Sequence, residues 1–298
     1  MRADFEGIFA ALATPFIQSN ISLEKFKENI EKYNEFDLAG YVVLGSTGES
    51  VYLTDEESEK LVIAAKSTVS PEKKIIVGTA RESTEMTLDF TNRMAALGID
   101  AALIRTPSYF TSDMTSQALK KHYLTIADRA KVPLLIYNIP QYTGVSVGKG
   151  LIIDLSSHPN IAGLKDSSGN LAFLAEVVPS VRSDFSILLG AGDLMLPGLL
   201  LGAKGGILRL ADVAPGLCVK LYKLFLDGRI EEARQLQLQL VPLNNAVIKD
   251  YGISGLKYAL DLAGYFGGLP RSPLLPLISE GKKQIENILK NLDLLKKE

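Results

Sequence analysis

The 298-residue sequence predicts an α/β fold, a (β/α)8 TIM barrel in residues 1–225 followed by a helical extension in residues 226–298. Short apolar segments rich in Val, Ile, Leu and Ala recur along the chain, and each ends in a turn. Amphipathic segments with helical spacing separate most of them, so strand and helix alternate with a period of roughly 20 to 35 residues. This alternation is typical of βα units with a parallel sheet, and eight units can close into a barrel.

The eight apolar segments are the expected strands, at residues 7–13, 40–44, 74–78, 101–105, 134–137, 161–164, 186–189 and 206–210. Amphipathic helices are expected between them, for example at residues 22–36, 54–67, 83–97 and 116–130. An open, doubly wound sheet is the alternative, but it usually carries a glycine-rich nucleotide-binding loop after its first strand. Here the first strand ends in ALATPF, which contains no such loop.

After about residue 213 the pattern changes to helices alone, at residues 216–226, 230–240 and 284–297. A stretch rich in Pro and Gly, residues 264–277, interrupts them. We expect the last barrel helix followed by a helical extension that packs on the barrel or on a neighbouring subunit. No low-complexity linker precedes the extension, so the sequence does not indicate a clearly separate second domain.

Composition excludes several classes of function. A net charge of -2 gives no electrostatic reason to expect a nucleic acid or a membrane surface as partner, and no apolar window approaches the length of a membrane span. The single cysteine, Cys218, excludes an internal disulfide, suits the cytoplasm and is expected to be buried. His122 and His158 lie far from any Cys or His cluster with metal spacing, so we expect surface residues and no metal.

The stretch IAGLKDSSGN, residues 161–170, is the expected chemical centre because a short strand delivers Lys165 into a polar turn. Side chains alternate along a strand, so Ile161, Gly163 and Lys165 are expected on one face, with Gly163 leaving space beside the amine stem. Burial lowers the pKa of a lysine, and the neutral amine can attack a carbonyl. The alternative is a strand-end lysine whose ammonium reaches solvent.

Three other strand ends carry candidate groups. The second strand ends in GSTGES, residues 45–50, a turn whose backbone N–H groups can converge on a carboxylate, and Thr54 with Glu57 predicts a capping box after it. The fourth strand places Tyr109 on its loop, and the fifth ends at Tyr137. Next to a lysine, a phenol could move protons for imine formation, so we expect these groups to point into one mouth. The alternative is that either tyrosine lies between core and surface with one satisfied hydroxyl.

With GSTGES, the Tyr109 loop, LLIYNIP and GLKDSSGN in this order, the chain resembles the dihydrodipicolinate synthase and N-acetylneuraminate lyase family of pyruvate-dependent class I aldolases. The resemblance runs from about residue 5 to residue 277. It implies a (β/α)8 barrel with a C-terminal helical extension, assembled as a homotetramer of two tight dimers. It also implies small oxo-acid and aldehyde substrates and a covalent pyruvate imine in place of a cofactor.

By this resemblance Lys165 would form the Schiff base with pyruvate, and Tyr137 would carry protons to and from the imine. Ser46 or Thr47 would connect Tyr137 to Tyr109, which relatives supply across the tight dimer interface. The amides of Ser46 and Thr47 would hold the pyruvate carboxylate, and the backbone near Ile207 would line the pocket. The candidate substrate-binding residues are therefore Ser46, Thr47, Ile207, Ser167, Tyr142 and Arg209.

One departure bears on the substrate. In that family the dihydrodipicolinate synthases carry an arginine for the carboxylate of aspartate semialdehyde, whereas Tyr142 stands at the matching position in YNIPQYTG. A phenol cannot replace a bidentate guanidinium. The segment from Asn244 onward and the DSSG turn are more similar to the 4-hydroxy-2-oxoglutarate aldolase branch. We therefore predict cleavage or formation of a 4-hydroxy-2-oxo acid, such as 4-hydroxy-2-oxoglutarate or a 2-keto-3-deoxy sugar acid, with pyruvate and an aldehyde as the other side of the reaction.

Two alternatives remain. The first is 4-hydroxy-tetrahydrodipicolinate synthase activity, which condenses pyruvate with aspartate semialdehyde, and the second is a catalytically silent sensor of oxo acids. The intact set of Lys165, Tyr137 and Tyr109 argues against the sensor. Arg105 and Arg209 interrupt apolar strand ends, and either could bind a distal carboxylate if it faces the barrel mouth. Pairing with acids on the outer face or at an interface is the alternative for both.

Overall fold

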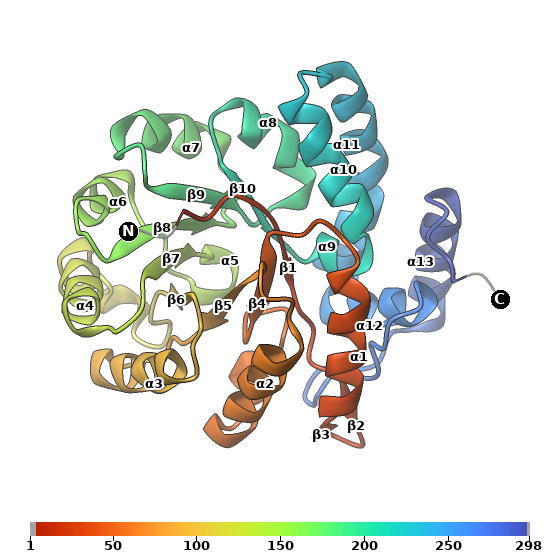
Figure 1. Ribbon diagram of the computed structural model, residues 1–298, viewed down its shortest axis with the longest axis horizontal. Coiled ribbons are helices and arrows are strands. Elements are labelled where there is room, and N and C mark those ends of the chain that lie inside the picture. The colour runs from red at the N-terminus through yellow and green to blue at the C-terminus, as the bar shows by residue number, and fades with distance from the viewer. Residues whose placement is uncertain (1–3, 297–298) are drawn as a thin grey trace.

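The computed structural model describes residues 4–296, in which eight parallel strands close into a barrel (Figure 1). Neighbouring strands pair in chain order, and β10 pairs with β1 to complete the ring. The strands are β1 Gly7–Ala11, β4 Gly40–Val43, β5 Lys74–Gly78, β6 Ala101–Arg105, β7 Leu134–Asn138, β8 Ile161–Asp166, β9 Ser186–Leu189 and β10 Gly205–Leu208. The predicted barrel and its expected strands are therefore confirmed, with small differences at the strand ends.

Helices form a ring around the strands (Figure 1). They are α1 Leu23–Asn34, α2 Asp55–Thr68, α3 Thr84–Ala96, α4 Ser116–Arg129, α6 Lys149–Ser156, α7 Leu171–Val177, α8 Met195–Leu200 and α10 Pro215–Leu226. Hydroxyl side chains begin several of them, and the predicted capping box of Thr54 and Glu57 is confirmed at the start of α2. Two short helices, α5 Pro140–Thr143 and α9 Leu210–Val213, follow β7 and β10 directly.

Two apolar layers hold the barrel together. The inner layer fills the barrel with side chains such as Phe9, Val42, Leu135 and Ile207. The outer layer lies between the strands and the helices, and it also includes Cys218, which is buried as predicted. Because the interior is filled, the free space for chemistry lies at the carboxyl ends of the strands.

Several short elements were not predicted. A hairpin of β2 Phe16–Ile17 and β3 Asn20–Ile21 follows β1, and Gln18 and Ser19 turn the chain with φ of 48° and 66°. Its turn contains no glycine, which is the usual sequence signal for such a conformation. The 3-10 turns are η1 Ser50–Tyr52, η2 Thr111–Asp113, η3 Val178–Ser180 and η4 Gly192–Leu194.

The chain ends in a helical segment formed by α11 Ile230–Asn245, a π-helical turn Ala246–Asp250, α12 Gly252–Leu262 and α13 Ser279–Asn291. In Figure 1 α12 and α13 lie beyond α1, on one side of the barrel. The predicted helix at residues 230–240 is longer, because buried Leu243 and Asn244 keep the chain helical past Pro242. The helix α12 was not predicted, and the predicted helix at 284–297 begins and ends earlier, with residue 297 outside the described part. The predicted boundary at residues 225–226 falls at the end of α10 and stays a prediction.

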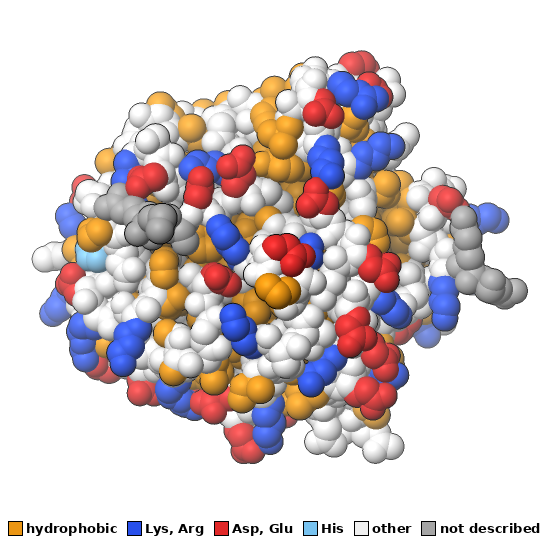
Figure 2. Space-filling view, in the orientation of Figure 1, with side chains coloured by type: hydrophobic (Ala, Val, Ile, Leu, Met, Phe, Trp, Pro, Cys, Tyr) orange, Lys and Arg blue, Asp and Glu red, His pale blue; other side chains and the backbone are white. Residues whose placement is uncertain are grey.

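The surface carries charges of both signs, and His122 is buried. Lysines and arginines alternate with acidic side chains over the face in Figure 2. No helix within residues 4–296 is long and apolar enough to cross a membrane. The prediction that His122 lies on the surface is wrong, because it is buried against α3, its Nδ1 is 2.9 Å from the Thr84 hydroxyl, and burial lowers its pKa to about 4.

Candidate active site

A cavity of about 730 Å3 opens at the carboxyl ends of the barrel strands, and we call it the mouth cavity. Its walls come from the loops after β4 and β7, the ends of β8 and β10, the turn after β9 and the C-terminal helical segment. Most of the candidate residues line it together: Ser46, Thr47, Tyr137, Tyr142, Lys165, Ser167, Ile207 and Arg209. Three residues of the C-terminal segment that sequence reasoning missed, Asn244, Ile248 and Lys249, also line it.

Lys165 lies at the end of β8, directly opposite Tyr137 of β7. Only 4% of Lys165 is exposed, and its Nζ is 4.2 Å from the centroid of the Tyr137 ring. Burial lowers the pKa of Lys165, the neighbouring Tyr137 opposes this, and the positive charge of Arg209 lowers the pKa further. The alternative of a lysine reaching solvent is therefore wrong, and the lowered pKa favours the neutral, nucleophilic form of the amine.

The expected side-chain alternation in β8 is wrong at its start. The pairing of β7 with β8 shifts register between Leu134 and Leu135, so Ile161 packs in the outer layer while Ala162 faces the barrel interior with Lys165. Gly163 also has a different role, because a Cβ there would collide with the Ser186 carbonyl oxygen of β9. The glycine allows two strands to approach each other and does not make room for the amine.

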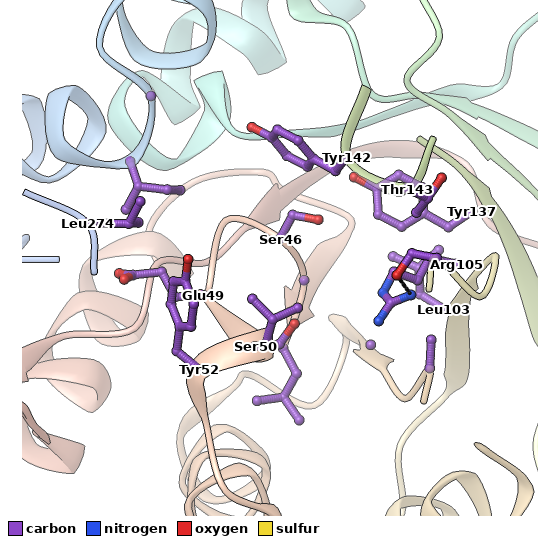
Figure 3. Close-up of a pocket in the computed structure, with 18 of the residues that line it drawn as sticks. Ser46, Glu49, Ser50, Tyr52, Leu103, Arg105, Tyr137, Tyr142, Thr143 and Leu274 are labelled. Carbon is purple, nitrogen blue, oxygen red and sulfur yellow. Dashed lines mark hydrogen bonds between the residues drawn. The ribbon is translucent and has the colours of Figure 1, made fainter. Parts of the chain in front are cut away.

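Tyr137 sits at the centre of the polar groups of the mouth cavity. Its burial raises the pKa of the phenol, but the charge of Lys165 and interactions with Ser167 and Ser46 outweigh this, so the pKa lies below its usual value. In Figure 3 Ser46 lies below the Tyr142 ring, with its hydroxyl on the side of Tyr137. The phenol thus lies beside the amine on one side and a hydroxyl on the other, which is the arrangement that proton transfer needs.

The turn that carries Ser46 and Thr47 is fixed by its neighbour Glu49. Glu49 adopts a left-handed backbone with φ of 55°, and its carboxylate forms an ion pair of 2.8 Å with Lys257 of α12. The side chains of Lys257 and Glu49 are 0% and 1% exposed, and Lys257 also donates to the carbonyl of Thr14 at 2.8 Å. Sequence reasoning missed this pair, although a lysine inside the apolar helix GISGLKYALDL is the signal that could have found it.

Tyr109 is not brought into the mouth cavity within one chain. It is 79% exposed, and its ring stands edge-on to Phe110 with centroids 5.0 Å apart. Glu82 holds this loop, accepting hydrogen bonds from the N–H groups of Ser108 and Tyr109 at 2.8 and 3.0 Å. The expectation that three strand ends point into one mouth is therefore wrong for Tyr109 in the single chain.

The two strand-end arginines differ. Arg105 pairs with Glu82 at 2.9 Å and lines a second cavity of about 430 Å3, which also contacts Ser46 and Tyr137 (Figure 3). Arg209 is 7% exposed and faces the mouth cavity. Arg105 thus pairs with an acid, as the alternative expected, but at the wall of a cavity and not on the outer face. For Arg209 the alternative is wrong.

No group of three or more His, Cys, Asp or Glu side chains in residues 4–296 is placed to hold a metal ion. The polar groups of the mouth cavity are instead an amine, phenols, hydroxyls and a guanidinium. These groups can form an imine with a carbonyl compound, move protons and bind a carboxylate.

Comparisons with known proteins agree with this arrangement. Residues 4–292 match the model of the dihydrodipicolinate synthetase family. The chain is 33% identical over 282 residues to the 4-hydroxy-tetrahydrodipicolinate synthase of Exiguobacterium sp., covering 94% of this chain and 96% of that protein.

Two solved structures are similarly close. The crystal structure of dihydrodipicolinate synthase from Thermotoga maritima has a TM-score of 0.94 at 30% identity, covering 98% of this chain and 100% of that one. The chloride-inhibited synthase from Acinetobacter baumannii, complexed with pyruvate, has a TM-score of 0.93 at 27% identity, covering 97% and 99%. The chain therefore belongs to the dihydrodipicolinate synthetase family, whose members are pyruvate-dependent enzymes of the class I aldolase type.

Proposed function

We propose that Lys165 forms a Schiff base with pyruvate and that the enzyme makes or breaks a carbon–carbon bond next to the resulting imine. The observation that carries this proposal is the buried Lys165 amine against the Tyr137 ring inside the mouth cavity. A lysine with a lowered pKa in a largely buried site is a nucleophile for a carbonyl carbon. The crystal structure of the Acinetobacter relative, which holds pyruvate, supports the choice of substrate.

The steps follow from the groups present. The neutral amine of Lys165 attacks C2 of pyruvate, and loss of water from the carbinolamine gives the iminium. Tyr137 donates the proton that leaves with the water and later accepts one, with Ser46 next to it in the relay. Loss of a proton from C3 gives an enamine, and its C3 attacks the aldehyde carbon. The N–H groups of Ser46 and Thr47 hold the pyruvate carboxylate during these steps.

The reaction with the best support is that of a 4-hydroxy-tetrahydrodipicolinate synthase, with aspartate semialdehyde as the aldehyde. Relatives of nearly equal length, from bacteria and archaea, carry this name at 31–34% identity. After the new bond forms, the amino group of the semialdehyde can attack the imine carbon, which closes a ring and releases Lys165. This reverses our preference between the two reactions predicted from the sequence.

Reversible aldol cleavage of a 4-hydroxy-2-oxo acid is the second candidate. One observation favours it, namely that Tyr142 stands where the resemblance places the carboxylate-binding arginine of the synthases. In this reaction the same Lys165 imine accepts the electron pair of the broken bond, and hydrolysis then releases pyruvate. The two candidates share the covalent chemistry and differ only in the second substrate.

Several further features belong to the proposal. We infer a homotetramer of two tight dimers in the cytoplasm, in which Tyr109 of one subunit completes the relay of its partner. The support in this chain is that Tyr109 and Phe110 are both exposed and next to each other on a loop fixed by Glu82. The covalent imine takes the place of a cofactor in this chemistry.

Borohydride reduction in the presence of pyruvate tests the shared chemistry. We expect a stable adduct on the peptide that contains Lys165, located by mass spectrometry. Consumption of pyruvate with aspartate semialdehyde, measured beside pyruvate release from 4-hydroxy-2-oxoglutarate and 2-keto-3-deoxy sugar acids, then separates the two candidates. Absence of any adduct would refute the proposal, and an oxo-acid sensor without catalysis would remain.

A further inference from the structure

Arg209 is a buried cation that forms no ion pair with an acid among residues 4–296. It follows β10, is 7% exposed and lines the mouth cavity. Its three hydrogen bonds go to neutral oxygens, with the Val247 carbonyl at 2.9 Å and the Thr47 and Tyr142 hydroxyls both at 3.4 Å. No carboxylate of residues 4–296 forms an ion pair with it. A buried charge costs free energy unless an opposite charge accompanies it, so the site is incomplete as it stands.

The nearest acid along the chain does not serve as this partner. Asp212 lies three residues further on, is buried and interacts electrostatically with Arg209, but the two form no ion pair. The Oδ2 of Asp212 instead accepts a hydrogen bond of 2.8 Å from the N–H of Ala13. Lys249, another cation on the wall of the mouth cavity, already pairs with Asp193 at 2.8 Å. Within residues 4–296, three cations line the mouth cavity: Lys165, Lys249 and Arg209. Besides Lys165, Arg209 is thus the one that an anion can still approach.

The guanidinium also has donors to spare. An arginine has five N–H groups, and one each on Nε, Nη1 and Nη2 is used, so one on Nη1 and one on Nη2 remain. Both terminal nitrogens can therefore still donate to an anion such as a carboxylate. The Tyr142 phenol, 3.4 Å from Nη2, stands beside them and can donate to the same anion.

We propose that Arg209 and Tyr142 form the subsite for a carboxylate on the aldehyde substrate. This inference rests on the proposed function, because Lys165 and the turn of Ser46 and Thr47 then hold pyruvate and leave Arg209 for the second substrate. A carboxylate is favoured over a phosphate because a single guanidinium, with a neutral phenol beside it, matches one negative charge. The subsite joins β10, the loop after β7 and the C-terminal segment, through Arg209, Tyr142 and Val247.

The first test compares Arg209→Met with a matched control, Arg129→Met. Arg129 pairs with Glu85 on the outer helices, away from the mouth cavity. For Arg209→Met we expect kcat/KM for aspartate semialdehyde to fall roughly 100-fold, the value of a bidentate charge-assisted contact. The KM for pyruvate should stay within about threefold, as should every parameter of the control. Borohydride trapping should slow in Arg209→Met at lower pH, because the charge of Arg209 no longer lowers the pKa of Lys165.

Two further variants separate recognition from folding. Arg209→Lys keeps the charge but loses the fork, so we expect an intermediate loss. The double variant Arg209→Met/Tyr142→Arg places a guanidinium at the neighbouring position 142. Its kcat/KM for aspartate semialdehyde should be roughly tenfold higher than that of Arg209→Met. With an uncharged aldehyde, butanal, the rate should fall in Arg209→Met by no more than the rate of borohydride trapping falls.

Succinate binding gives a readout that does not depend on turnover. Calorimetry should show succinate binding to the wild-type enzyme and to Arg129→Met, and loss of binding in Arg209→Met. Equal losses with aspartate semialdehyde and butanal would overturn the subsite, as would a preference for glyceraldehyde 3-phosphate over carboxylate-bearing aldehydes. Succinate binding through Arg209 without any pyruvate adduct would refute the proposed function and leave the anion site standing.

Discussion

At the scale of single residues, the function depends on how burial changes two side chains. Lys165 and Tyr137 face each other across β7 and β8, and each changes the pKa of the other. In water a lysine is protonated at neutral pH and does not attack carbonyls. The barrel lowers the pKa of Lys165 because it removes the amine from water, and it supplies a phenol at the same place.

Replacing Lys165 tests the nucleophile. We expect Lys165→Met to lose the borohydride-trapped adduct entirely and to lose activity by more than about 1,000-fold, because no other amine of residues 4–296 lies at the Tyr137 ring. Lys165→Arg, which keeps a positive charge, should be equally inactive. In the wild-type enzyme, trapping should slow as the pH falls through the lowered pKa of Lys165, since only the neutral amine reacts. A trapped adduct in Lys165→Met would contradict the assignment.

Replacing Tyr137 tests proton transfer. Tyr137→Phe keeps the ring against Lys165 but removes the phenol oxygen, so we expect kcat to fall by roughly 100-fold to 10,000-fold. The KM for pyruvate should change little, because the carboxylate contacts come from the turn after β4. Pre-steady-state trapping should show slow imine formation. A variant with normal kcat would remove Tyr137 from the relay.

At the scale of elements, strand contacts and buried acids set the position of these residues. The register shift between β7 and β8 turns Lys165 inward together with Ala162, and Gly163 lets β8 approach β9. Neither feature follows from simple side-chain alternation. Both depend on which strand lies next to which.

Gly163 gives a direct test of this packing. A methyl group there would collide with the Ser186 carbonyl, so Gly163→Ala should lower the free energy of unfolding by about 3 kcal/mol or more. The matched control is Gly150→Ala in α6, where a Cβ meets no atom within 4 Å. Because alanine favours helix over glycine, the control should gain up to about 1 kcal/mol. Equal denaturant midpoints for both variants would contradict the close strand approach.

Asp212 predicts a pH dependence of stability. Burial raises the pKa of its carboxyl from 3.8 to about 7, while one oxygen accepts from the N–H of Ala13. The folded state then holds its proton more tightly than the unfolded state, so stability from this group is fully present below about pH 4 and declines as the pH rises to about 7. Asp212→Asn keeps a neutral side chain. We expect the free energy of unfolding of Asp212→Asn, relative to that of the wild-type enzyme, to rise by roughly a few kcal/mol from pH 4 to pH 8.

Denaturant unfolding of both proteins at several pH values can contradict this prediction. A constant difference between Asp212→Asn and the wild-type enzyme would mean that the carboxyl is ionised at all of them. The opposite slope would mean that its pKa is lowered by folding. Either outcome would remove Asp212 as a cost to stability at neutral pH.

At the scale of the whole molecule, the C-terminal segment is part of the candidate site. Lys257 of α12 reaches Glu49 in the turn after β4, and the N–H of Arg271 donates to the other oxygen of the same carboxylate at 2.9 Å. The side chain of Arg271 also pairs with Glu57 at the start of α2. The turn that would hold the pyruvate carboxylate is thus fixed from outside the barrel.

The Glu49–Lys257 pair predicts a separation of stability from binding. Lys257→Met leaves the Glu49 carboxylate buried without its cation, so we expect a loss of about 3–5 kcal/mol in the free energy of unfolding. The double variant Glu49→Gln/Lys257→Met removes both charges and should recover most of this loss. Its KM for pyruvate should stay roughly tenfold higher than in the wild-type enzyme, because the turn is no longer held in place. A double variant with an unchanged KM would contradict the positioning role.

The sequence by itself determined the barrel, the chemical type of the site and most of its residues. Apolar strands, helical spacing and capping residues depend on residues close together in the chain, so the sequence predicts them. Lys165, Tyr137 and the GSTGES turn stand at strand ends that the barrel brings together. The β2–β3 hairpin was not predicted, because short elements without a glycine or a periodic pattern have no local signal in the sequence.

Only the tertiary structure decided which arginine faces the mouth cavity, that Tyr109 lies outside it, and that Lys257 supports the site. It also decided the inward face of β8 through a register shift. These features depend on contacts between residues far apart in the chain, such as Glu49 with Lys257 or Arg209 with Thr47. Burial and partner choice at such distances are set by packing of the whole barrel, and local patterns carry no information about them.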